Sequence, residues 1–372
     1  MRAFAAIWTS IESAVVGAFG PSSAYGAPAL LGALAFAALY YVGERRARGR
    51  PSSVRGFVRS IFPRRVVLHP SSLVDIRLWL MNGVVLASAY GMLSGGLFFW
   101  RDAVDASLVH AFGARVPTSW PIAAVLALAT ALQVLAYELA YWLSHYALHK
   151  VPALWEFHKV HHSAEAMTIF TELRQHPVEI LLVVNLVGLS TGLVFGAMAY
   201  AFGPGVRPFT LLNGNVLMMT FLLTYGHLRH SKIWIAFTGP VGLILHSPAH
   251  HQLHHSVDPI HHDKNFGFAL SLFDWAFGTL VVPSKRRQPI AIGVGADSPH
   301  YRSVAANLLI PFARLAPSTL LRMVLSPASR ATPFTHLESP GLRSRLLEKR
   351  TPQGRQARVG EGLRAPILPD AP

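Results

Sequence analysis

Long apolar runs, separated by short polar segments, dominate the first two-thirds of the 372-residue chain. A helix needs about 20 apolar residues to cross a bilayer, so the runs that approach this length predict membrane spans. We expect spans over residues 24–43, 78–100, 121–143 and 178–202, with 208–225 as a fifth span or as the returning half of a helical hairpin. The shorter run over 233–245 is expected to be buried or interfacial. The pattern predicts an all-α, polytopic membrane helical bundle with four to five membrane-embedded helices.

The two ends of the chain differ from this apolar middle. Residues 1–20 lack a clean cleavage-site pattern, so we expect an interfacial or peripheral helix rather than a cleaved signal peptide. Residues 304–325 predict one or two amphipathic surface helices broken at Pro311 and Pro317, and about the last 40 residues should be poorly ordered. The predicted organisation is an N-terminal segment 1–69, a membrane domain 70–283 and a basic, partly disordered cytoplasmic tail 284–372.

Histidine is unusually frequent at the ends of the apolar runs, because fifteen of the nineteen histidines lie between His145 and His262. Eight of them form three short boxes: His145 and His149; His158, His161 and His162; His251, His254 and His255. On a helix, positions i, i+3 and i+4 share one face, and neutral imidazole is the commonest metal ligand in proteins. Because one tetrahedral zinc accepts only four ligands, eight imidazoles predict two metal ions in a shared cage.

Composition supports a membrane protein and excludes several kinds of chemistry. The chain is 52% hydrophobic and only 14% charged, whereas soluble domains carry about 25% charged residues. It contains no cysteine, which excludes disulfides, thiolate-bound haem, cysteine-ligated iron–sulfur clusters and cysteine nucleophiles. The net charge of +15 comes without a basic and aromatic module, so the arginines indicate membrane flanks rather than nucleic-acid binding.

Charge topology predicts which side of the membrane carries the boxes. The loop over 44–77 is rich in arginine, and the positive-inside rule places it in the cytoplasm. Eight of its arginines are Arg45, Arg46, Arg48, Arg50, Arg55, Arg59, Arg64 and Arg65. The nearly neutral loop over 101–119 should then face outward, and all three boxes return to the cytoplasmic face. We therefore predict a multi-pass protein of the bacterial inner (cytoplasmic) membrane with a histidine-rich helical cap in the cytoplasm.

The ligand type leaves the metal and the reaction open, since imidazole suits iron, copper, zinc and nickel. A di-iron centre that activates dioxygen against a lipid chain fits histidine-only boxes at a membrane surface. A metal-dependent membrane lipid hydrolase stays open, although no box contains the glutamate of a His-Glu-x-x-His motif. A non-catalytic metal sensor or carrier also stays open. Haem needs only two axial ligands and would not require three clusters.

Over roughly residues 70–283, the ordered boxes resemble the fatty acid hydroxylase / sterol desaturase superfamily of membrane di-iron enzymes. The last box is followed by Asp263-Lys-Asn265-Phe266-Gly267, which is similar to the family's Asn-Tyr/Phe-Gly segment. Next comes Phe273-Asp274-Trp275-Ala-Phe277-Gly278-Thr279, similar to its Trp-Asp-x-x-Phe-Gly-Thr signature. Upstream, Arg174-Gln-His176-Pro177-Val-Glu179 also matches a recurring family segment.

The resemblance implies a helical membrane fold with two iron ions, dioxygen as co-substrate and electrons from a separate donor protein. It further implies a lipid substrate, such as a fatty acyl chain or a sterol-like molecule, taken from the bilayer. It gives ligand roles to the eight box histidines and no catalytic role beyond them. His230 aligns best with the family's additional histidine, and His227 is the alternative. We expect hydroxylation of a C–H bond in preference to desaturation, which the boxes do not exclude.

Four residues near the boxes are candidates for holding ligands by hydrogen bonds: His176, His250, Asn265 and Asp274. Each also has a purely structural alternative, such as capping a helix or forming a turn. Glu138 lies within an apolar run, where a charge is costly, so we expect it to face the bundle interior. Its partner is either a ligand histidine or an arginine, and the sequence does not choose between them.

Overall fold

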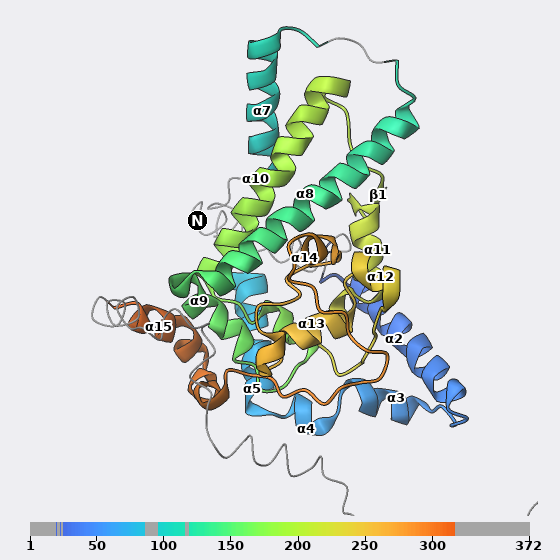
Figure 1. The fold of residues 1–372 in the computed structure, drawn as a ribbon, viewed down its shortest axis with the longest axis vertical. Helices are drawn as coiled ribbons and strands as arrows, with labels where there is room; N and C mark the ends of the chain where they lie inside the picture. Colours follow the sequence, from blue (N-terminus) through green and yellow to red (C-terminus); the bar gives the residue numbers. More distant parts are fainter. Residues whose placement is uncertain (1–19, 21–22, 24, 86–95, 116–118, 317–372) are drawn as a thin grey trace, which may run out of the picture. The chain divides into compact units, whose positions relative to one another are not determined.

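The computed structural model describes residues 20, 23, 25–85, 96–115 and 119–316, all within one compact unit, Met1–Phe334. This part of the chain is mostly helical. Three of its helices are long and apolar enough to cross a membrane: α2 (Ala27–Ala47), α8 (Ile122–Lys150) and α10 (Pro177–Phe202) (Figure 1). They confirm three of the predicted apolar helices. Helix α8 continues past residue 143 to Lys150 and so carries the first histidine box. The predicted total of four to five membrane-embedded helices stays a prediction.

The predicted second span, 78–100, differs in the structure. Helix α5 (Pro70–Leu80) continues into a π-helical turn, η1 (Met81–Val85), and residues 86–95 lie outside the described part of the chain. Helix α7 (Leu97–Phe112) then covers most of the stretch predicted as the 101–119 loop, so that prediction is wrong. The charged positions Arg101 and Asp102 favour a loop in the sequence, but in the helix Asp102 is exposed and the Arg101 guanidinium donates to the carbonyl of Pro204, just after α10, at 2.8 Å.

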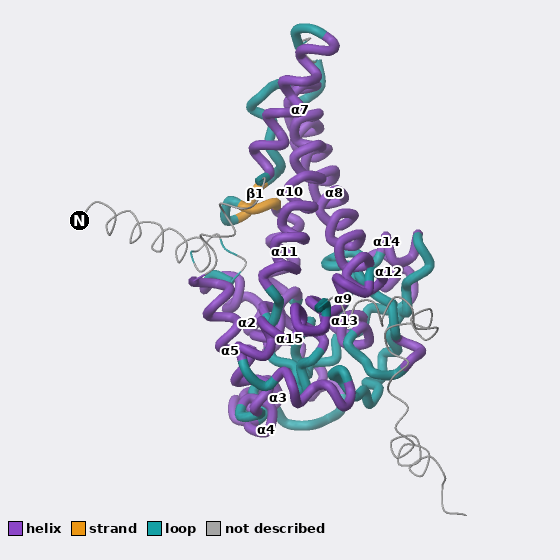
Figure 2. Tube along the Cα trace, turned by 90° about the vertical axis from the view of Figure 1, so that its left-hand side faces the viewer, coloured by secondary structure: helices purple, strands orange, loops and turns teal. Residues whose placement is uncertain are grey.

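Helix α7 packs along α10, and both views show the two helices side by side (Figures 1 and 2). The contact follows a stripe of glycines on α10, of which Gly192 and Gly196 lie against α7. A Cβ atom on Gly196 would lie 2.6 Å from the carbonyl oxygen of Arg101. Glycine therefore lets the two backbones approach closely, as small residues do between membrane helices.

Residues 208–225 do not form the continuous fifth helix that their hydropathy predicts. Two short antiparallel strands, β1 (Thr210–Leu211) and β2 (Gly214–Asn215), come first. Leu212 and Asn213 join them with positive φ angles of 49° and 64°, the conformation of a type I′ hairpin turn. Helix α11 (Val216–Thr224) follows and has only nine residues. Asn213, a residue type that tolerates positive φ, occupies the second position of this turn, a local signal that hydropathy does not register.

Short helices surround the C-terminal end of α8, near Lys150, and two of them carry the second and third histidine boxes. The second box lies on α9 (Pro152–His162), and the third lies on α13 (Pro248–His254) with His255 as its C-cap residue. The other elements of this region are α3 (Val54–Ile61), α4 (Arg64–Val67), η2 (Ile169–Leu173), η3 (Gly226–Leu228), α12 (Gly239–Ile244), η4 (Pro259–His261), α14 (Leu272–Ala276), η5 (Gly295–Tyr301) and α15 (Val304–Arg314). Its placement in the cytoplasm stays a prediction.

Helix α15 confirms an amphipathic helix at the start of the 304–325 segment. The predicted break at Pro311 is wrong, since Pro311 lies inside this helix. A proline removes one backbone donor, and the helix nevertheless continues to Arg314. The break predicted at Pro317, the helix predicted over 1–20 and most of the 284–372 tail lie outside the described residues. The domain boundaries at 69 and 283 stay predictions.

Candidate metal centre

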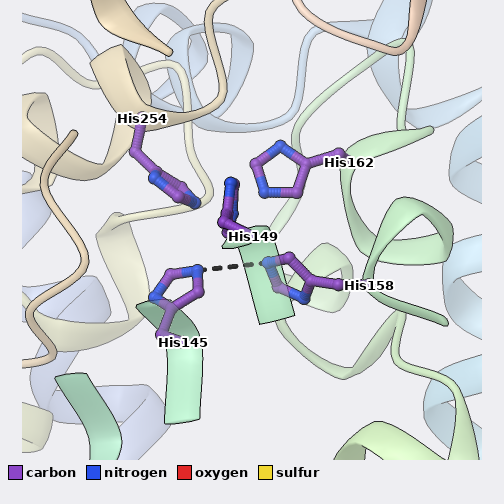
Figure 3. A group of neighbouring side chains, drawn as sticks. All are labelled: His145, His149, His158, His162 and His254. Carbon is purple, nitrogen blue, oxygen red and sulfur yellow. Dashed lines mark hydrogen bonds between the residues drawn. The ribbon is translucent and has the colours of Figure 1, made fainter. Parts of the chain in front are cut away.

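Nine buried histidines form two groups in which the candidate ligand atoms lie within 4.8 Å of one another. The first group contains His145, His149, His158, His162 and His254 (Figure 3). The second contains His161, His230, His251 and His255. All eight box histidines and His230 are therefore brought together in space, whereas His227 belongs to neither group.

Helical spacing explains how three boxes make two groups. On α8, His145 and His149 are four residues apart and both point into the first group. On α9, His158 and His162 join the first group while His161 joins the second. On α13 the division is reversed: His254 enters the first group, and His251 and His255 enter the second. Because α9 and α13 each contribute to both groups, the two sites are built as one unit.

The nitrogens of the second group lie as close together as ligands around one ion. The Nε2 atom of His230 lies 2.9 Å from that of His251, 3.2 Å from that of His161 and 3.3 Å from that of His255. A metal about 2.1 Å from each nitrogen would separate neighbouring ligands by about 3.0 Å at right angles and about 3.4 Å in a tetrahedron. A neutral imidazole has a single N–H, so protons cannot satisfy all these contacts.

Backbone carbonyls and a carboxylate fix the orientation of four rings. The Nδ1–H groups donate to oxygen: His145 to Phe266 (2.9 Å), His161 to Arg174 (3.3 Å), His254 to Lys264 (2.8 Å) and His158 to the Glu179 carboxylate (2.9 Å). Since these oxygens only accept, the proton of each neutral ring is on Nδ1 and the lone pair is on Nε2. This is how proteins usually prepare histidine for a metal.

One consequence is visible in Figure 3, where the Nε2 atoms of His145 and His158 face each other at 3.1 Å. With both Nδ1 atoms protonated, two lone pairs meet, and no hydrogen bond joins neutral rings of this tautomer. The buried Nε2 atoms of His149, His162 and His254 in the same group likewise have no hydrogen-bond partner among the described residues. Unpaired buried nitrogen is costly, and a shared cation would satisfy all five.

Burial keeps six of the nine grouped histidines, all outside the long helices, in the neutral form that binds metal. It lowers the pKa values of His230 and His254 to about 3, the latter against an opposing hydrogen bond to Lys264. It also lowers the pKa values of His161, His162, His251 and His255, and the neighbouring imidazoles lower them further. At neutral pH these side chains are uncharged ligands.

The other predicted residues act away from the two groups. His176 caps α10, because its Nδ1 accepts from the Val178 amide at 3.1 Å. His250 forms a capping box with Ser247 at the start of α13. His227 lies with its Nδ1 3.4 Å from the Glu172 carboxylate. Burial would raise the pKa of Glu172, but the buried guanidinium of Arg229 holds it below the ordinary value.

Asn265 and Asp274 organise the loop that follows the last box. Asn265 has a positive φ of 59° and bonds the carbonyl of His250 and both backbone groups of Val281. Asp274 accepts from the amides of Phe266 and Gly267, each at 2.8 Å. Because the Phe266 carbonyl orients His145, Asp274 acts on a candidate ligand through the backbone, one step away.

Sequence reasoning missed the role of two buried charges. Glu138 pairs with neither a histidine nor an arginine; its carboxylate accepts from the three consecutive amides of Phe268, Ala269 and Leu270. Its signal was a carboxylate inside an apolar run. Arg174 is wholly buried, and its backbone carbonyl faces His161. Its signal was membership of the Arg-Gln-His-Pro segment, which says nothing about its contacts.

Replacing Glu179 with alanine should weaken metal binding about 10- to 100-fold, the usual cost of losing a carboxylate that orients a ligand histidine. The substitution frees the Nδ1 of His158 and its ring orientation. Metal content after dialysis against graded chelator measures the effect. Gln175→Ala is the matched control, because Gln175 donates to the same carboxylate oxygen at 3.2 Å without touching His158. Unchanged metal retention in Glu179→Ala would remove His158 from the candidate ligands.

Comparison with known proteins shows which proteins the histidine-rich part of the chain is similar to. Residues 130–279 match the family model described as fatty acid hydroxylase. The chain is 29% identical over 155 residues to alkylglycerol monooxygenase of Danio rerio, covering 42% of this chain and 31% of that protein. It is 27% identical over 198 residues to the ornithine lipid hydroxylase OlsE of Rhizobium tropici, covering 53% of each. The chain thus spans about a third to a half of the length of these relatives. No solved structure matches it.

Proposed function

We propose that the chain, whose residues 130–279 match the fatty acid hydroxylase family model, is a member of the fatty acid hydroxylase / sterol desaturase superfamily and an integral membrane oxidoreductase that hydroxylates a lipid. The single observation that carries the proposal is the pair of histidine groups whose lone pairs converge. Such a cage fits metal ions, and it lies at the end of an apolar helix that is long enough to cross a membrane.

The donor set fits two metal ions, one held by His145, His149, His158, His162 and His254 and the other by His161, His230, His251 and His255. We propose iron for both positions, because imidazole binds iron and zinc has no redox chemistry. When bound, two iron ions would supply the electrons that activate dioxygen and the oxidising power that breaks a C–H bond. His227 lies outside both groups, which favours His230 as the ninth ligand.

The chain's own residues hold this site at the lipid boundary. Up to Leu143, the only charged residue of helix α8 is the buried Glu138, and His145 and His149 lie in its last two turns before Lys150. An acyl or sterol-like chain in the bilayer would therefore meet the metal site without leaving the membrane. The arginines that follow α2 support a cytoplasmic site. The proposed reaction consumes one dioxygen, two electrons and two protons, and it yields an alcohol and water. The electrons would come from a separate donor protein.

The proposal predicts a new lipid species in a host that expresses the chain in air. Mass spectrometry of total lipids, with and without the gene, should reveal a lipid heavier by one oxygen atom that disappears under anaerobic growth. A host expressing His254→Ala serves as the matched control. A lipid lighter by two hydrogens would make the protein a desaturase. A change that persists without oxygen would support the hydrolase, and unchanged lipids in a host supplied with a working donor would support the metal carrier.

A further inference from the structure

Large apolar side chains project from two short helices beside α8. Helix α12 exposes Val241, Leu243 and Ile244, and Trp275, Phe277 and Val282 are exposed in and after α14. The exposed fractions of Trp275 and Phe277 are 59% and 57%. We call these six residues the apolar shoulder. Contiguous exposed apolar surface on this scale marks a contact with a membrane or a partner.

The two helices form one surface. The amide of Ser271, just before α14, donates to the carbonyl of Ile244 at the end of α12 at 2.8 Å. A second backbone hydrogen bond joins the His246 amide to the Ala269 carbonyl at 2.9 Å, and Leu245 and Leu270 form an antiparallel bridge between the same segments. Both views place α12 and α14 next to each other (Figures 1 and 2), and α14 also contacts α8. Backbone hydrogen bonds therefore hold the two parts of the apolar shoulder together as one surface.

The shoulder continues the apolar face of a candidate membrane span. The Phe277 ring stacks on Trp142 of α8 with centroids 4.5 Å apart, and the Trp142 indole donates to Asp274 in α14 at 3.1 Å. On either side of Trp142, Leu139 and Leu143 are 40% and 50% exposed. In the proposed membrane placement, these exposed leucines of α8 face lipid. The neighbouring apolar shoulder then lies at the same depth in the bilayer.

Charge is distributed around the shoulder as at a membrane surface. Residues 233–245 contain no Asp, Glu, Lys or Arg, and residues 265–283 contain only Asp274, which is fully buried. Cations stand at the borders of both segments: Lys232 before the first, Lys264 before the second, and Lys285, Arg286 and Arg287 after it. Lysines and arginines beside apolar segments contact anionic lipid headgroups.

We propose that the apolar shoulder inserts into the bilayer leaflet beside the metal centre, with its bordering lysines and arginines at the headgroup level. The proposal rests on the membrane placement in the proposed function and adds a second, non-spanning contact with lipid. Helix α13, which carries His251 and His254, lies between α12 and α14 in the chain. Insertion on both sides would hold the last histidine box at the lipid surface, where a membrane substrate arrives.

Because the chain has no cysteine, single cysteines report depth without background. Nitroxide labels at Ile244→Cys and Trp275→Cys, in full-length protein reconstituted in phosphatidylcholine/phosphatidylglycerol vesicles, would be tested by electron paramagnetic resonance. Collisions with dioxygen report lipid, and collisions with a water-soluble nickel chelate report water. Leu193→Cys on α10, 45% exposed, is the lipid control. Ala296→Cys on the exposed side of η5 is the water control.

Labels at 244 and 275 should behave like the label at 193, with several-fold greater access to dioxygen than to the nickel chelate. Behaviour like the label at 296 would overturn the insertion while leaving the membrane placement intact. Labels that neither reagent reaches would also overturn it, since another protein surface would then cover the shoulder. A label at 193 in water would instead refute the membrane placement in the proposed function.

Discussion

Replacing His254 with alanine should abolish metal binding in the first group and reduce lipid hydroxylation by more than about 100-fold, since losing a ligand costs more than losing its orienting partner. The Nε2 atom of His254 has no hydrogen-bond partner among the described residues, and its Nδ1 is held by the Lys264 carbonyl. The ring is therefore committed to the cage. Because α13 also carries His251, the second metal should bind more weakly as well. Metal analysis of purified protein and lipid mass spectrometry measure the two effects.

His261→Ala is the matched control for this experiment. His261 lies seven residues further along the same histidine-rich segment but belongs to neither group. Its substitution should leave metal content and activity unchanged, and both variants should insert into membranes normally. Full activity in His254→Ala would contradict the ligand assignment. Equal losses in both variants would indicate a general effect of the segment on folding.

Replacing Arg174 with methionine should destabilise the protein by about 3–5 kcal/mol, the usual cost of leaving one member of a buried ion pair alone. The guanidinium and the Asp75 carboxylate are both wholly buried and lie 2.7 Å apart. The same guanidinium also donates to Val160 O, Ser71 O, Ser71 Oγ, Ser163 Oγ and Tyr301 O. It thus ties α5, α9 and η5 together behind His161. The temperature of thermal unfolding in detergent measures the loss.

A second substitution separates the charge from the packing. Adding Asp75→Leu to Arg174→Met removes the stranded carboxylate and should restore part of the lost stability. Arg302→Met is the control, because Arg302 pairs with Glu165 at 2.7 Å on the surface, where ion pairs contribute little. An Arg174→Met protein that unfolds at the wild-type temperature would show that this network does not hold the fold.

The proximity of the box histidines could be predicted from the sequence because helical spacing determines which side chains meet. His145 and His149, or His251 and His255, are four residues apart and cannot avoid sharing a face. The apolar length of α8 and α10 was equally direct. The choice between His230 and His227 was not, because His227 lies in the short 3-10 turn η3, His230 lies after it, and Arg229 between them pairs with the distant, buried Glu172.

The errors have a common physical source in contacts between distant segments. The sequence predicts a loop over 101–119, where charged residues follow an apolar run, but glycines on α10 give α7 a surface to pack on. The sequence suggests a histidine or an arginine as the partner of Glu138, but its carboxylate accepts hydrogen bonds from backbone amides of a loop 130 residues away. Hydropathy and motifs describe each segment of the chain alone. They do not reveal which segment, distant in the sequence, supplies a hydrogen-bond donor or a surface to pack against.

The proposed hydroxylation is tested most directly by tracing where the oxygen atom of the new lipid hydroxyl comes from. Membranes containing the protein, supplied with a reductant system and lipid, would be incubated with dioxygen labelled with heavy oxygen in ordinary water. Hydroxylation by the metal centre should place heavy oxygen in the new lipid hydroxyl, none in membranes of the His254→Ala variant, and none when the label is in the water instead. A product whose oxygen comes from water would contradict hydroxylation by dioxygen and identify a hydrolase.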